Sequence, residues 1–391
     1  MRHLIHVLCI AFFSLAVFVL LAGCHGDEKN IVAPPAPRET INLTYQNPLK
    51  IEVNSAQHLA LLLNDRQSPR GTALQLVDLD HKNVVASRIL DFYDAYDVIF
   101  LFNQEGCFVG KTQDTREFAI QFFSLPDLVM GARVNTGDTT GVHGFLTADS
   151  AGQAVYYSHA GGGNGDGVYK IALGANKRLI DADDDSHAPF AFDNHLVSGL
   201  FATPARIFFD NLSQKIVVAN GSDNYITMID AALWGTVHRG GLSFPISGTE
   251  HWSTVGGSLS SARAEGMDGS EGTYIFAGMS GLSAFLSRFS VSSTLPYPPE
   301  VYPQCQWTFQ NGMIHTHNGS SIFSVFIPQH DTSGYSIGEY GLNNLRPVAG
   351  SPHRVQTMPD SLMGAVGLDR VLNKLVVANI HQPRLELIPI R

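Results

Sequence analysis

Charge is scarce in this sequence. Charged residues make up 15% of the 391 residues, against about 25% in an average globular domain. Acidic residues outnumber basic ones by 35 to 25, which leaves a formal net charge of −10. Because such a chain is repelled by a phosphate backbone, nucleic acid is excluded as a partner. Hydrophobic residues make up 44%, which excludes an extensively disordered protein as well.

Cysteine is also scarce. Of the four cysteines, Cys9 falls inside an N-terminal apolar run and Cys24 follows it, so only Cys107 and Cys305 belong to the body. This number excludes a cysteine-rich zinc module. An exported chain lies in an oxidising compartment, so a disulfide between Cys107 and Cys305 and two buried free thiols both remain open.

The N-terminus carries the pattern of an export signal. An almost unbroken apolar run follows Arg2 and ends in Leu21-Ala22-Gly23-Cys24. This pattern resembles a bacterial lipoprotein signal with its lipobox, in which the cysteine takes a diacylglyceryl group. We prefer this interpretation to a single membrane-spanning helix because the run stops at a cysteine in that context. His25 stands where an aspartate would favour the inner membrane, so the outer membrane is favoured.

The chain is therefore predicted to have three segments. Residues 1–23 are the lipoprotein signal peptide, and residues 24–44 hold the lipidated Cys24 and a charged, proline-rich, flexible tether. Residues 45–391 form the folded body. We expect acyl chains, rather than a helix, to anchor this body to a membrane on the periplasmic side of the cell envelope.

Helix-period stretches are scarce in the body, which alternates short β-branched or aromatic runs with Gly, Asn, Asp and Ser. One internal repeat stands out, because Asp210–Asn220 (DNLSQKIVVAN) echoes Asp369–Asn379 (DRVLNKLVVAN). An apolar run precedes and follows each copy. The unit is a strand, a tight turn begun by aspartate, a second strand, a short loop and a third strand, which is typical of a β-propeller blade.

Weaker copies of this unit recur along the chain. Their apolar strands begin near residues 59, 98, 154, 215, 273, 321 and 374. The sequence therefore predicts an all-β protein with a single β-propeller, seven-bladed, while six or eight blades and a pair of β-sandwiches remain alternatives. The last strand ends near Ile390, and we expect a strand from residues 41–53 to pair with it. This pairing closes the ring and leaves few sheet edges exposed.

Histidine is abundant, with 16 in the chain, and imidazole binds zinc readily. Counting three residues back from the turn Asp or Asn places Glu265 and His315 at equivalent positions of consecutive units, near the central channel. His317 lies two residues beyond His315 and shares its strand face. Zinc needs three or four ligands, so the candidates are His315, His317 and Glu265 with His143 or His251. Hydrogen-bonded structural histidines are the alternative.

Two further segments have compositions found in binding sites. A second cluster can form a cation site or a solvated acidic loop; it contains Asp181, Asp183, Asp184, Asp185 and His187. The glycine-rich segment 159–167 lies between two predicted strands and no Lys follows it, so we expect a hairpin rather than a phosphate loop. No Gly-x-Ser-x-Gly elbow precedes a helix, and we expect no enzymatic activity.

Together these features resemble the AztD family of periplasmic zinc metallochaperones. The resemblance covers roughly residues 45–391. It rests on the blade pattern and on two short segments, Gly141-Val142-His143-Gly144 and Ala264-Glu265-Gly266. It implies an exported propeller that binds Zn²⁺ and passes it to the solute-binding protein of a zinc importer. The His-rich N-terminal segment expected in that family is reduced here to His25 and its acidic neighbours, and a lipid anchor differs from a freely diffusing chaperone.

The expected function is therefore that of a lipid-anchored periplasmic propeller that binds zinc without catalysing a reaction. Its partner is expected to be a zinc-transport solute-binding protein or another envelope protein. One alternative is a metal-free scaffold lipoprotein of the outer membrane, with an aromatic rim around residues 297–302. Another is a metal-dependent hydrolase or lactonase, which needs more acidic residues on the inner strands than the sequence offers there. The fold alone does not decide among them.

Overall fold

The computed structural model describes residues 39–390 with gaps, the longest of which span 174–194, 232–249, 254–261, 291–299, 308–313, 329–335 and 355–362. All 29 regular elements in the described residues are β-strands. Within those residues, no helix has the length and apolar character needed to cross a bilayer.

The described strands form seven sheets, six with four strands and one with five. The first sheet contains β2 (Pro48–Asn54), β3 (Leu59–Gln67), β4 (Arg70–Asp78) and β5 (Asn83–Leu90). The second contains β6 (Phe92–Leu101), β7 (Glu105–Thr112), β8 (Phe118–Ser124) and β9 (Val129–Asn135). The third contains β10 (His143–Ala148), β11 (Ala154–Ala160), β12 (Gly167–Ala172) and β13 (His195–Ser198). The fourth contains β14 (Pro204–Asp210), β15 (Lys215–Asn220), β16 (Tyr225–Asp230) and β17 (Glu250–Ser253). The fifth contains β18 (Ala262–Ser270), β19 (Thr273–Ser280), β20 (Ser283–Ser290) and β21 (Glu300–Pro303).

The last two sheets depart from the plain four-strand order. The sixth contains β22 (Cys305–Trp307), β23 (Ile314–His317), β24 (Ser321–Pro328), β25 (Ser336–Gly341) and β26 (His353–Arg354). Both β22 and β23 pair with β24, so together they take the place of one inner strand. The seventh contains β27 (Met363–Asp369), β28 (Lys374–Asn379), β29 (Arg384–Pro389) and, at its outer edge, β1 (Glu39–Asn42).

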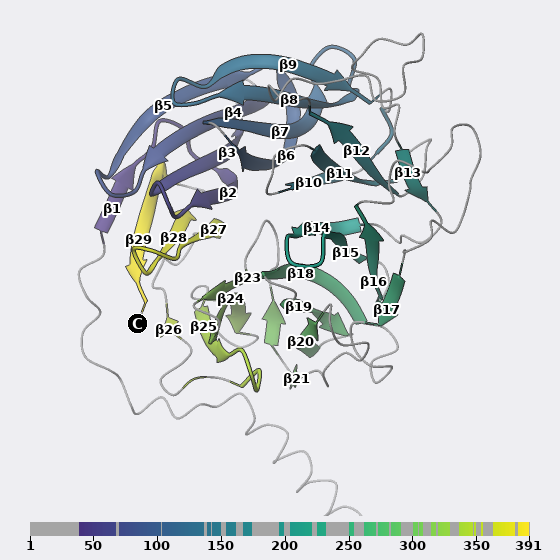
Figure 1. The fold of residues 1–391 in the computed structure, drawn as a ribbon. Helices are drawn as coiled ribbons and strands as arrows, with labels where there is room; N and C mark the ends of the chain where they lie inside the picture. The colour runs from purple at the N-terminus through teal and green to yellow at the C-terminus, as the bar shows by residue number, and fades with distance from the viewer. Residues whose placement is uncertain are drawn as a thin grey trace, which may run out of the picture.

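The sheets stand around a common centre (Figure 1). Neighbouring sheets contact one another through their first strands, as β2 does with β6 and β27, and β18 with β14 and β23. These first strands are called the inner strands below. The arrangement confirms the predicted all-β propeller. Six of the seven predicted strand starts match the second strand of a sheet. The start near residue 98 falls in the inner strand β6, because the second strand β7 (EGCFVGKT) is less continuously apolar.

Both faces of a sheet are covered by its neighbours, which explains the continuous apolar runs in the sequence. In β3, Ala60, Leu61, Leu62 and Leu63 are all fully buried. Successive side chains of a strand point to opposite faces. Accordingly, Ala60 and Leu62 pack in a core shared with the seventh sheet, while Leu61 and Leu63 pack in a core shared with the second.

The repeated turn between the first and second strands has a chemical cause. The carboxylate of Asp369 accepts hydrogen bonds from the N–H groups of Val371 and Leu372, at 3.0 and 2.9 Å. Asp210 accepts the N–H of Ser213 in the same way, at 3.0 Å. An aspartate that binds backbone groups two or three residues ahead favours this turn, which is why the repeated motif begins with Asp.

The ring is closed by β1. This strand pairs antiparallel with β29, with Ile41 opposite Leu385. Ile41 is buried in the core between the first and seventh sheets. The predicted ring closure is thus present, but its strand spans residues 39–42, inside the segment expected to be tether. Residues 48–54 form the inner strand β2 instead.

A buried ion pair links three consecutive sheets near the centre. The ammonium of Lys50 on β2 lies 3.0 Å from Oδ1 of Asp97 on β6, and both side chains are largely buried. Oδ2 of Asp97 accepts the N–H of Leu146 on β10, at 2.9 Å. The carboxylate of Asp97 therefore binds one polar group from each neighbouring sheet: the ammonium of Lys50 in the first and the N–H of Leu146 in the third.

We expect Asp97→Ala to lower the free energy of unfolding by about 3–5 kcal/mol, because it leaves the buried Lys50 ammonium without its anion. Denaturant unfolding would measure this loss. Glu52→Gln is the matched control: Glu52 lies 3.7 Å from the same ammonium but is more exposed, so a change below about 1 kcal/mol is expected. Equal losses in the two variants would contradict the role assigned to Asp97.

We expect Ile41→Ala to destabilise the protein by about 2–5 kcal/mol, because it creates a cavity in the core at the ring closure. The same unfolding assay measures the effect. Thr40→Ala changes the neighbouring, exposed residue of β1 and should stay within about 0.5 kcal/mol of the parent. If Ile41→Ala also stays within that range, β1 does not hold the ring closed.

Candidate functional site

The structure places four of the five candidate zinc ligands on inner strands. His143 begins β10, Glu265 lies in β18, and His315 and His317 lie in β23. Because β18 contacts β23, Glu265 and the two histidines of β23 come from neighbouring strands around the centre. The repeat in the sequence predicted that these two strands are neighbours.

The predicted equivalence of Glu265 and His315 is not what the register shows. Asp268, taken in the sequence as the turn residue, lies inside β18 opposite Ile275, and the strand continues to Ser270. Glu265 is thus 270 − 265 = 5 residues before its strand end, whereas His315 is 317 − 315 = 2 before the end of β23. By this count Asp268 is the β18 residue that corresponds to His315.

Glu265 occupies a β-bulge. The pairing of β18 with β19 passes from Ala264 opposite Gly278 to Gly266 opposite Ala277, so Glu265 is the extra residue. Similar register shifts occur near the start of β2, β6 and β14. Bulges of this kind locally redirect a strand and are common beside functional sites. Four inner strands, β2, β6, β14 and β18, therefore share an irregularity near their first residues.

His315 has a defined hydrogen bond. Its Nε2 lies 2.9 Å from the carbonyl oxygen of Val366 on β27. A carbonyl oxygen only accepts, so Nε2 donates its N–H and the lone pair of the imidazole is on Nδ1. A histidine that binds a metal usually donates its other N–H to a carbonyl or carboxylate. The same bond also suits a structural histidine that joins two neighbouring sheets.

His251 lies apart from the other candidates. It belongs to β17, opposite Thr227 of β16, and β17 is the outermost strand of its sheet. Three strand spacings separate β17 from the inner strand β14, or about 14 Å. A ligand set around the centre therefore does not include His251.

Among the described side chains, no group of three or more His, Cys, Asp and Glu is arranged to hold a metal ion. The side chains of His143, Glu265 and His317 lie outside that part of the structure, as do those of the acidic cluster at residues 181–187. The glycine-rich segment joins β11 to β12, two antiparallel neighbours, which agrees with the expected hairpin.

Cys107 is a free thiol. It is fully buried on β7, and burial raises the pKa of this thiol well above its ordinary value, with a smaller contribution from the charge of Asp97. A buried neutral thiol is unreactive. The structure therefore answers the open question for Cys107: it takes part in no disulfide, and Cys305 lies on β22 of another sheet.

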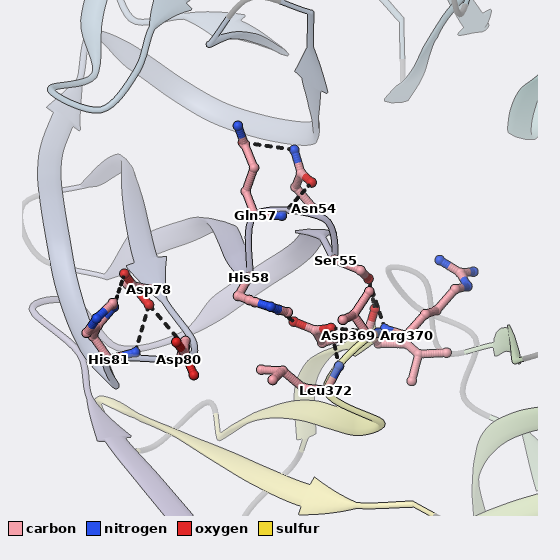
Figure 2. Close-up of polar contacts among 12 residues, drawn as sticks. Asn54, Ser55, Gln57, His58, Asp78, Asp80, His81, Asp369, Arg370 and Leu372 are labelled. Carbon is pink, nitrogen blue, oxygen red and sulfur yellow. Dashed lines mark hydrogen bonds and ion pairs between the residues drawn. The ribbon is translucent and has the colours of Figure 1, made fainter.

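A polar network that was not predicted from the sequence lies where the first and seventh sheets meet (Figure 2). Nδ1 of His58 lies 3.0 Å from Oδ2 of the buried Asp369. The hydroxyl of Ser55 contacts the carbonyl of Leu368 at 3.4 Å and accepts the N–H of Arg370 at 2.9 Å. Each contact joins the turn after β2 to the turn after β27. Asp369 was visible in the sequence as a turn residue, but its partner stands 311 positions away.

A second pair in Figure 2 lies on the surface. Nδ1 of His81 lies 2.9 Å from Oδ2 of Asp78, whose Oδ1 accepts the N–H of His81 at 2.8 Å. The hydrogen bond to Asp78, and then its charge and that of Asp80, raise the pKa of His81 above its usual value. This turn joins β4 to β5 and carries two carboxylates beside one imidazole.

Comparison with known proteins supports the fold alone. Chaetomium thermophilum Raptor matches with a TM-score of 0.59 and 11% identity over 90% of this chain, which spans only 29% of the Raptor chain. The Cps50 (Swd1) β-propeller domain of Myceliophteria thermophila matches with a TM-score of 0.57 and 7% identity, over 90% of this chain and 100% of that domain. No protein-family model and no curated protein matches the sequence. The chain is therefore a β-propeller in fold.

We expect NMR titration to give a raised pKa for His81 and Asp78→Asn to bring it back toward the ordinary value. The pair stabilises the fold in full below the ordinary histidine pKa, and its contribution is lost as the pH rises through the raised pKa. Asp80→Asn is the control, because Asp80 acts on His81 through its charge alone and should lower the pKa less. A larger shift in Asp80→Asn than in Asp78→Asn would contradict this assignment.

Proposed function

We propose that this chain is an exported, lipid-anchored β-propeller that binds zinc at its centre and presents the ion to a partner of the cell envelope. The observation that carries the proposal is the contact between β18 and β23. It brings an acidic strand, with Glu265 and Asp268, beside a strand with His315 and His317. Carboxylate oxygen and imidazole nitrogen are both ordinary zinc ligands.

The hydrogen bond of His315 supports the same proposal. Donation from Nε2 to Val366 fixes the tautomer and the ring orientation, which is the usual role of a second partner of a metal-binding histidine. Nδ1 is then the atom that would bind the ion. His317 lies opposite Ser321 of β24, two residues further along the strand, and is the second imidazole of the proposed site.

The acidic ligand is proposed to come from β18. Asp268 corresponds to His315 by register, whereas Glu265 lies three residues further from the turn, at the bulge. Three residues of strand span about 10 Å, so one zinc ion uses one of these carboxylates. His143, on β10, would join only from across the centre.

The resemblance to AztD metallochaperones supports delivery of zinc to a solute-binding protein of a zinc importer. Transfer to a partner requires ligands that the partner can displace. A site made from a few side chains at the centre of a propeller meets this requirement better than a closed four-cysteine site. We propose no enzymatic step and no nucleic-acid partner. The lipidation of Cys24 would hold the protein beside the membrane.

Elemental analysis tests the proposal. The mature chain, purified without chelators or a His-tag and incubated with equimolar zinc, should retain roughly one zinc ion per chain. His315→Ala with His317→Ala should abolish this retention, and His251→Ala, on an outermost strand, should leave it unchanged. Comparison of Asp268→Asn with Glu265→Gln identifies the carboxylate.

Absence of retained zinc in the parent chain would overturn the metal-binding proposal. It would favour a metal-free scaffold lipoprotein, whose envelope partner could then be identified by crosslinking in cells. Equal retention in the parent and the double histidine variant would show that zinc binds elsewhere on the chain.

A further inference from the structure

The turns of the propeller divide between two faces. Because consecutive strands of each sheet are antiparallel, turns that follow the first and third strands lie on one face, and turns that follow the second strand lie on the other. We call the former the anchor face. In the seventh sheet, the anchor face carries the turn from Asp369 to Lys374 and the end of β29 at Pro389. Asp369 pairs with Lys374, and Lys374 pairs with Pro389, so all three lie at the same end of the sheet.

The tether leaves the body on this face. Glu39 begins β1 opposite Leu387, near the end of β29. Its carboxylate binds the ammonium groups of Lys374, at 2.6 Å, and of Lys82, at 3.2 Å. Both lysines belong to turns or strand ends of the anchor face. The residues that precede Glu39 therefore start from the anchor face.

The tether is short. Cys24 stands 39 − 24 = 15 residues before Glu39. Fully extended, 15 residues reach about 50 Å, and a flexible chain spans about half of that or less. A lipid on Cys24 would therefore keep the anchor face close to the membrane.

Exposed apolar side chains gather on the same face. Seven large hydrophobic residues are exposed in the described part of the chain. Three of them lie in turns that follow an inner strand: Phe102, Leu212 and Val371, exposed by 41%, 72% and 61%. Val129 follows the turn after the third strand of the second sheet and is exposed by 53%. The other three, Val85, Ile89 and Val348, lie on outer strands or beside them.

The positions of Leu212 and Val371 are equivalent. Each is the third residue of an aspartate-initiated turn, after Asp210 and Asp369, and they belong to the fourth and seventh sheets. Arg370, beside Val371, is exposed. An apolar tip beside a guanidinium suits the interface of a bilayer, where the tip enters the acyl boundary and the cation stays among the phosphates.

We propose that the anchor face docks on the lipid surface that holds the acyl chains of Cys24, with Phe102, Leu212 and Val371 inserted among the headgroups. The proposal rests on the lipid anchoring in the proposed function, and not on zinc binding. We assign lipid as the partner of this face because the short tether joins the body here. Docking in this orientation turns the opposite face, and one opening of the centre, toward soluble partners.

Spin labels on the lipidated, full mature chain test the proposal. Leu212→Cys and Val371→Cys each receive a nitroxide, and Gln113→Cys, in the exposed turn between β7 and β8 on the opposite face, is the matched control. The proteins are reconstituted in vesicles of phosphatidylethanolamine and phosphatidylglycerol. The spin relaxation of each nitroxide by oxygen, which concentrates in lipid, is compared with its relaxation by a water-soluble nickel complex. Cys107 is buried, and the parent chain, labelled in the same way, gives the background from Cys305.

The oxygen-to-nickel ratio is expected to rise several-fold at positions 212 and 371 on reconstitution, and to stay unchanged at position 113. A mass spectrum of the N-terminal peptide first establishes whether Cys24 carries lipid. Absence of lipid overturns the anchoring itself. A lipidated chain whose labels at 212 and 371 remain water-accessible overturns docking, as does protection of these labels only in whole envelopes, which would indicate a protein partner. A rise at all three positions would also overturn the assigned orientation.

Discussion

The pairing of β1 with β29 is the contact on which the ring depends. Because β1 continues into β2 after five residues, its pairing makes the covalent chain itself a link between the first and seventh sheets. Both sheets bury the apolar residues that face this junction, including Ile51 of the first sheet and Leu385 of the seventh. The hydrogen bonds of Ser55 and His58 to the turn at Asp369 add a polar contact at the same junction. Closure also covers the outer edge of the seventh sheet.

Closure of the ring explains where the polar residues lie. Each sheet needs an apolar covering on both faces, so a charged side chain inside the ring must find polar partners, as Asp97 does with Lys50 and Leu146 of the two neighbouring sheets. His315 meets the same condition through Val366. The centre is therefore a place where a few polar side chains are held in fixed positions, which is a requirement of any ligand-binding role.

The sequence predicted the strands better than their alignment. Continuous apolar runs and aspartate-initiated turns located the second strands of six sheets, because both signals are local. The position of Glu265 was misjudged because Asp268 resembles a turn residue but lies within a longer strand. His58 and Asp369 could not be paired from the sequence, because only the closed ring brings residues 311 positions apart together. The outer location of His251 likewise depends on strand order, which the repeat does not encode.

The position of β1 has a consequence for biosynthesis. Among the described strands, β1 is made first and its partner β29 last, so their pairing waits until the intervening sheets have been synthesised. The entropy of closing so long a loop grows only slowly with its length, but the contact forms late because it joins the most distant parts of the fold. A chain that lacked its last few residues would keep most of its core and still expose the edge of β28 to strand addition from other chains. Completion of the ring thus depends on synthesis through β29.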